Sequence, residues 1–262
     1  MAATLQTGPG AVLSADIAVP DRDRELRFYS RVLTTGPAPF WREDLMNSLG
    51  IPVIGLGERV KAYAELPLQW MPHIQVEDVG VSAERAVALG GRVLLRHEDD
   101  DGESQWAVLV DPNGAAFGLI PVVPPEAIPS SMTGPGVEST GRIAWLDLTG
   151  PNAPTTRDFY RDVVGWSVED VEMEDAEGSY ADYALCTADG TGVAGACHAR
   201  GVNEGLPPVW LLYLPVGDLE ESLARAREEG GEIVRVRTTS SGELAYAVLR
   251  DPVGACFALV PG

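Results

Sequence analysis

The pattern of hydrophobic and polar residues predicts strands that alternate with amphipathic helices. In the first half we expect strands at 15–19, 70–76, 106–110 and 116–120 and helices at 22–33 and 78–89. Leu26, Tyr29 and Leu33 recur at helical spacing within the first of these helices. Gly90 follows the second helix, where a left-handed cap would end it. This order of elements is typical of an α+β protein.

The same pattern occurs twice in the chain. Residues 111–121 read like residues 251–261, an offset of 140, and residues 28–29 repeat as 159–160, an offset of 131. Two constant offsets indicate an internal duplication. The second copy therefore carries nine extra residues, which we place in the acidic run 169–177.

The repeat divides the chain into two domains of similar organisation. We expect the first over 10–122, the second over 141–262, and a linker rich in Pro, Gly and Ser over 123–140. Each domain contains two βαβββ units, so the predicted fold is an α+β tandem duplication with four such modules.

Charge and composition exclude several classes of partner. The 262 residues carry 19 basic and 39 acidic side chains, a formal net charge of −20. This argues against nucleic acid and anionic membranes and is compatible with a cationic small molecule. The three cysteines form no Cys-x-x-Cys pair, residues 1–13 lack signal-peptide features, and no apolar run could span a membrane. We expect a cytoplasmic monomer or homodimer.

The order of short motifs resembles one protein superfamily. The motifs are residues 19–21 before 28–29, Gly90-Gly91, and Asp-Pro-x-Gly before an apolar strand, each with a counterpart in the second half. Together they resemble the vicinal oxygen chelate superfamily, which includes glyoxalase I, extradiol dioxygenases and bleomycin-resistance proteins. The second copy is most similar to the tandem glyoxalase-like proteins of actinobacteria. The resemblance implies two half-open, barrel-like sheets, each with a ligand on its concave face.

The resemblance also implies where catalytic relatives bind a divalent metal. Those positions hold Ser14, Met71 and Gly118 in the first half and Trp145, Leu211 and Ala258 in the second. Apart from the weak ligand Ser14, none of these side chains coordinates Zn²⁺, Fe²⁺ or Ni²⁺. We therefore expect no metal and no cofactor, and no metal-dependent glyoxalase or dioxygenase activity.

Strand alternation selects the candidate ligand-binding residues of the concave faces. They are Ser14, Asp16, Met71, His73, Gln75, Trp106, Trp145, Asp147, Tyr213 and Tyr246, although the sequence does not define which way Trp106 and Tyr246 face. Asp16 and Asp147 stand in otherwise apolar strands, where a carboxylate is costly unless it is paired. Each is either a framework residue that accepts backbone hydrogen bonds or a cavity anion.

Two functions follow from these residues. The preferred one is a metal-free binding protein that captures a planar aromatic, cationic natural product, such as an antibiotic or an anthracycline-like polyketide. It would serve in self-resistance or as a biosynthetic accessory. The alternative is a metal-independent enzyme on an aromatic polyketide-type substrate, with Asp16, Asp147 and His73 as acid–base groups. Absent metal ligands, aromatic cavity positions and acidity favour binding.

Overall fold

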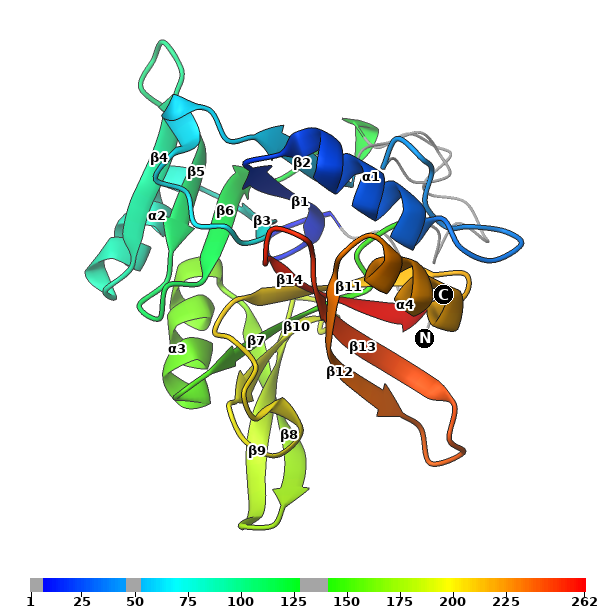
Figure 1. Ribbon diagram of the computed structural model, residues 1–262. Coiled ribbons are helices and arrows are strands. Elements are labelled where there is room, and N and C mark those ends of the chain that lie inside the picture. The colour runs from blue at the N-terminus through cyan, green and yellow to red at the C-terminus, as the bar shows by residue number, and fades with distance from the viewer. Residues whose placement is uncertain (1–6, 46–52, 128–140) are drawn as a thin grey trace.

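The computed structural model describes residues 7–45, 53–127 and 141–262, which form two sheets (Figure 1). The first sheet has the strand order β2-β1-β3-β6-β5-β4. Its strands are β1 (Val12–Val19), β2 (Ile54–Glu58), β3 (Met71–Val76), β4 (Arg92–Glu98), β5 (Ser104–Val110) and β6 (Ala116–Pro121). Among the described strands, β2 and β4 are the edges of this sheet and do not pair with each other to close a barrel.

The second sheet has the order β12-β13-β14-β11-β7-β10-β9-β8. Its strands are β7 (Trp145–Gly150), β8 (Ser167–Asp175), β9 (Gly178–Cys186), β10 (Gly192–His198), β11 (Trp210–Val216), β12 (Glu232–Thr238), β13 (Leu244–Arg250) and β14 (Cys256–Pro261). The strands of the two halves thus belong to separate sheets, and the predicted α+β tandem duplication is confirmed.

In the part of the chain that the structure describes, the first module has fewer strands after its helix than the other three. Within the described residues only β2 follows α1 (Arg22–Leu33), whereas β8, β9 and β10 follow α3 (Ala153–Val164). The hairpin β8–β9 includes the acidic run 169–177, in which we placed the nine extra residues of the second half. As a result β2 is an edge strand, while β10 is covered by β9.

Local capping explains the positions of the helices. Asp78 starts α2 (Val79–Ala88) by accepting the Val81 amide at 2.8 Å, and Asp218 starts α4 (Leu219–Glu228) by accepting the Glu221 amide at 2.8 Å. The four helices described have 10 to 12 residues each. None of them is long and apolar enough to cross a membrane.

The halves share one hydrophobic core, in which helices of different halves pack together. α1 lies beside α4, and α2 lies beside α3 (Figure 1). Phe28 meets Phe257 edge-to-face with ring centroids 6.0 Å apart, and Phe117 meets Phe159 at 6.2 Å. The repeated Phe-Tyr pair therefore belongs to the junction between the halves, where its burial is a main source of stability.

Buried hydrogen bonds also join the halves. Tyr29 donates its hydroxyl to Oδ2 of Asp251 at 2.9 Å and accepts the Trp70 indole N–H at 3.0 Å. In the second half Tyr160 accepts the indole N–H of Trp210 at 3.1 Å. The aspartate of the Asp-Pro turn is thus part of the junction as well as of its own turn.

Removing the Tyr29 hydroxyl should destabilise this junction. Tyr29→Phe leaves the Trp70 N–H and one Asp251 oxygen without their partner, which costs about 1–3 kcal/mol. Urea denaturation of the variant measures the loss. Tyr63→Phe is the control, because Tyr63 is 40% exposed. Equal stabilities of the two variants would show that the Tyr29 hydroxyl contributes nothing to the junction.

Candidate functional site

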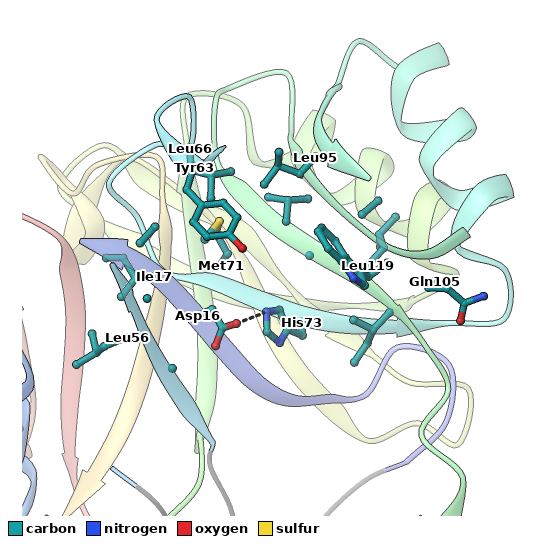
Figure 2. A pocket seen from close by; sticks show the side chains of 18 residues that line it. Asp16, Ile17, Leu56, Tyr63, Leu66, Met71, His73, Leu95, Gln105 and Leu119 are labelled. Atoms are coloured by element: carbon teal, nitrogen blue, oxygen red, sulfur yellow. Dashed lines mark ion pairs between the residues drawn. The ribbon is translucent and has the colours of Figure 1, made fainter. Parts of the chain in front are cut away.

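The concave face of the first sheet holds a cavity of about 510 Å³ (Figure 2). Most of its wall is apolar and includes Leu56, Leu66, Met71, Leu95, Trp106 and Leu119. The polar side chains are Asp16, His73, Gln105 and Tyr63, and no Arg or Lys of the described residues lines the cavity. Pockets of this size and composition are typical of small-molecule sites.

One polar corner of the cavity is lined by Asp16 and His73, and His73 also contacts Ser14 on β1, which does not line the cavity. Ser14 Oγ lies 2.9 Å from His73 Nδ1, and His73 Nε2 lies 3.6 Å from Asp16 Oδ2. Figure 2 shows Asp16 on β1 and His73 on β3 pointing toward each other. A neutral His73 ring with its proton on Nε2 would present this N–H toward Asp16 and accept the Ser14 hydroxyl at Nδ1.

Burial and charge act in opposite directions on this corner. Burial lowers the pKa of His73, and the neighbouring Asp16 carboxylate partly opposes this by raising it. His73 is therefore favoured as a neutral ring at neutral pH. The Asp16 side chain is 57% exposed, so its carboxylate is accessible to a ligand that enters the cavity.

A glycine on the neighbouring strand leaves the space that each strand aspartate occupies. Asp16 pairs with Gly55 and Asp147 pairs with Gly195 in parallel register. A side chain at either glycine would collide with the aspartate carboxylate. The recurrence of Asp16 and Asp147 thus has a framework explanation: each carboxylate lies over the neighbouring strand, in the space that a glycine leaves.

On the matching face of the second half, aromatic side chains and a thiol pack around Asp147. Trp145 donates its indole N–H to Asp147 Oδ1 at 2.8 Å, and the Cys197 thiol contacts the same oxygen at 3.8 Å. Tyr213 and Tyr246 pack edge-to-face above it, with centroids 5.6 Å apart. Burial raises the pKa of Asp147 to about 6, although hydrogen bonds from Tyr213 and Trp145 oppose the rise.

The strand register revises the positions that the family resemblance implied for a metal. Ser14 pairs with His73, and His73 pairs with Gly118, so His73 rather than Met71 lies between the outer two positions. In the second half Tyr213, and not Leu211, lies between Trp145 and Ala258 in the same way.

These two sets of side chains do not fit a divalent metal. His73 is the one usual metal ligand among them, and three are needed for a catalytic site. Within the described part of the chain, no group of three or more His, Cys, Asp or Glu side chains is arranged to hold a metal ion.

Other sequence-predicted residues divide between the cavity and the framework. Trp106 lines the cavity, is 38% exposed, and stacks on His97 with centroids 5.8 Å apart. Gln75 lies outside the cavity, contrary to the expected alternation. It is fully buried, and its amide oxygen accepts the Val123 backbone N–H at 2.8 Å. The segment after β6 thus binds the end of β3 at which we expected a ligand to bind.

Sequence reasoning missed several residues of the cavity. Tyr63, Leu66 and Gln105 come from a loop and from a strand whose facing was undefined. Gly55 and Gly57 also line the cavity, and the 140-residue offset matches them to Gly195 and Cys197. The change from Gly57 in the first half to Cys197 in the second is the sequence signal that the first concave face has more free space.

Comparison with protein families assigns both halves to related models. Residues 142–259 match the model described as Glyoxalase/Bleomycin resistance protein/Dioxygenase superfamily, and residues 13–120 match the model described as Glyoxalase-like domain. The matched ranges fall on the two sheets and leave out the segment between them.

Individual relatives were found among curated proteins and solved structures. CFP32 of Mycobacterium tuberculosis, which carries the name of a glyoxylase, is 29% identical over 78% of this chain and 77% of its own. The anthracycline biosynthesis protein DnrV of Streptomyces peucetius is 28% identical over 74% of this chain and 66% of its own. Homoprotocatechuate 2,3-dioxygenase of Brevibacterium fuscum superposes with a TM-score of 0.55 at 14% identity, over 100% of this chain and 82% of that one. The last match shows a shared fold.

Proposed function

Since the chain belongs to the glyoxalase/bleomycin resistance/dioxygenase superfamily, with one glyoxalase-like domain in each half, we propose that its first-half cavity is a ligand-binding site and not a metal centre. The protein captures a planar aromatic, cationic natural product of the anthracycline-like polyketide type, in self-resistance or as a biosynthetic accessory. The observation that carries this proposal is an apolar cavity of about 510 Å³ lined by His73 and Gly118, two of the three first-half positions that correspond to the family's metal ligands.

The charges of the cavity support a ligand that is cationic or rich in hydrogen-bond donors. Asp16 supplies a carboxylate, and no Arg or Lys of the described chain lines the wall to balance it. An anionic ligand would meet this charge in an apolar surrounding, where repulsion is strong. The exposed ring of Trp106 offers a surface for stacking. The relatives DnrV and DauV are named anthracycline biosynthesis proteins, which supports the ligand class.

The first test compares the two strand aspartates. Asp16→Asn should weaken the binding of doxorubicin, an amino-sugar anthracycline, by about 1–3 kcal/mol, a tenfold to more than hundredfold rise in Kd. Asp147→Asn is the matched control and should keep the wild-type Kd, because Trp145 covers that carboxylate. Fluorescence titration measures both. Unchanged affinity in Asp16→Asn would assign Asp16 to the framework alone.

The stacking surface gives an independent check of the same site. Trp106→Ala should weaken doxorubicin binding through lost ring contact, by about 0.5–1.5 kcal/mol beyond the buried area. Its effect should not change with salt concentration, whereas that of Asp16→Asn should fall as salt rises. Full affinity in Trp106→Ala would place the ligand elsewhere.

A second candidate function rests on the polar corner formed by Asp16 and His73. The chain of contacts from Ser14 through His73 to Asp16 could move a proton to or from a bound substrate. In that case chelator-treated protein converts an aromatic polyketide substrate to a product that mass spectrometry detects, and His73→Ala abolishes conversion while binding persists. Binding without conversion supports the first function.

A further inference from the structure

The second half places its own aromatic ring on the aspartate that corresponds to Asp16. Trp145 stands two residues before Asp147 on β7, and its indole N–H donates to Asp147 Oδ1 at 2.8 Å. The ring packs against an apolar cluster that includes Leu211, Tyr213 and Val248. The second concave face therefore already contains a planar aromatic group with a ring N–H on a carboxylate.

The frame around this contact is the same in both halves. Asp16 lies over Gly55 as Asp147 lies over Gly195. His73 pairs with Ser14 across the strands in the same register in which Tyr213 pairs with Trp145. The two faces thus hold their aspartates by the same backbone arrangement.

The main difference is the size of the side chain two residues before each aspartate. Ser14 is too short to cover Asp16, and its hydroxyl is bound to the His73 ring. The Asp16 side chain is accordingly 57% exposed, whereas Asp147 is half-buried beneath Trp145, Cys197 and Tyr213. Asp16 is left with a free acceptor where Asp147 has an indole donor.

We propose that the ligand of the first half puts a planar aromatic ring carrying its own N–H or O–H donor on Asp16, as Trp145 does on Asp147. This inference rests on the proposed function and specifies the group that contacts Asp16. That group is a hydrogen-bond donor on the ring system, and this contact does not require a positive charge. A hydrogen bond from a neutral ring donor to a carboxylate is charge-assisted and roughly twice as strong as one between neutral groups. Indoles and phenolic polycycles meet this description.

Two isomeric probes separate the donor from the ring. 3-Methylindole and 1-methylindole have the same size, but methylation at N1 removes the N–H. We expect 3-methylindole to bind the wild-type protein at least about tenfold more tightly, in ligand-observed NMR titrations. Asp16→Leu should abolish the difference between the isomers, and Asp147→Asn should preserve it. In NMR spectra of the protein, the signals of His73 and Trp106 should shift when 3-methylindole binds. These shifts would place the bound isomer in the first-half cavity.

Each outcome decides one question. Equal binding of the two isomers in this cavity overturns the donor requirement and leaves the proposed function standing. Doxorubicin binding without binding of 3-methylindole also overturns it, since a donor-bearing ring is then insufficient. If neither doxorubicin nor 3-methylindole binds, the proposed function fails together with the inference.

The second half tests the same contact through stability. Trp145→Ser copies Ser14 and leaves a ring-sized hole above Asp147. We expect 3-methylindole to raise the Tm of this variant and 1-methylindole to have a much smaller effect, with no comparable rise for wild type. If the variant fails to fold, Trp145→Phe keeps a ring without the donor, and the pH dependence of its stability should differ from wild type where Asp147 titrates. Equal rescue by both isomers, or an unchanged pH dependence in Trp145→Phe, would contradict the inference.

Discussion

Glu25→Gln is expected to stabilise the protein at pH 8 by about 3–5 kcal/mol relative to wild type, and to remove much of the decline in stability between pH 5 and pH 8. Glu25 lies on α1, is fully buried, and neither of its carboxylate oxygens accepts a hydrogen bond. Its neighbour across the junction is the buried carboxylate Asp251. Glutamine keeps the shape of Glu25 and donates its amide N–H without taking up a proton.

The proton of this carboxyl pair belongs to Glu25. Asp251 accepts hydrogen bonds from the Tyr29 hydroxyl and from the backbone N–H groups of Val253 and Ala255, all of which favour its charged form. Burial and the charge of Asp251 raise the pKa of Glu25 to about 8, with a small opposing effect of Arg24. Protonated Glu25 can then donate to Asp251.

The sign of the pH dependence follows from this shift. The folded pKa of Glu25 lies above its ordinary value of 4.5, so the folded state binds more protons than the unfolded state between pH 4.5 and about 8. The contribution of Glu25 to stability is complete below pH 4.5 and is lost as the pH rises through 8. In the second half Thr156 occupies the matching position, so Glu25→Thr should also remove this pH dependence.

Urea denaturation at several pH values measures the effect. Glu84→Gln is the matched control, because it removes one exposed carboxylate from a helix and should leave the pH dependence of wild type unchanged. Parallel pH curves for wild type and Glu25→Gln would mean that Glu25 is ionised in the folded protein, contrary to this account.

Ser14→Trp combined with His73→Tyr is expected to abolish ligand binding while the fold is retained. The double variant copies Trp145 and Tyr213, a pair that the second half packs without difficulty on the same backbone frame. The new indole would cover Asp16 and occupy the surface offered to a ligand ring. Losing about 100–150 Å² of apolar contact corresponds to roughly 3 kcal/mol or more, about a hundredfold in Kd.

Doxorubicin titration together with circular dichroism tests this result. The reverse change in the second half, Trp145→Ser with Tyr213→His, is the matched control and should leave first-half binding intact. A double variant that folds and still binds doxorubicin with the wild-type Kd would show that the ligand does not use the space beside Asp16.

Features of this structure that depend on local interactions or on direct repetition can be predicted from the sequence. The helix predicted over 22–33 coincides with α1, because its apolar spacing and its N-terminal Asp21 are both local signals. The duplication and the α+β organisation follow from repeated segments, which need no knowledge of contacts. Asp218 and Glu221 have the spacing of a capping box in its acidic form, and Asp218 starts α4 as this local pattern predicts. Glu221, however, binds Arg225 and the Gly36 amide instead of completing a capping box.

Differences between the halves, by contrast, depend on tertiary structure. Asp16 and Asp147 occupy matching positions of the repeat, yet one is exposed in a cavity and the other is covered, in part by Cys197 from a neighbouring strand. The facing of Trp106 likewise depends on how β5 pairs with its neighbours. Strand register places His73, rather than the aligned Met71, between Ser14 and Gly118, and the spacing of motifs does not specify this register.

The sequence by itself determined the repeat, the helix starts and the residue types available to a ligand, since these depend on neighbours within a few positions or on direct similarity. Only the tertiary structure decided that Asp16 lines a cavity while Asp147 is covered by Trp145 and its neighbours. It also brought Glu25 to Asp251, 226 positions away in the chain, because helices of one half pack against turns of the other. Burial and pairing over such separations arise from packing, and no local pattern encodes them.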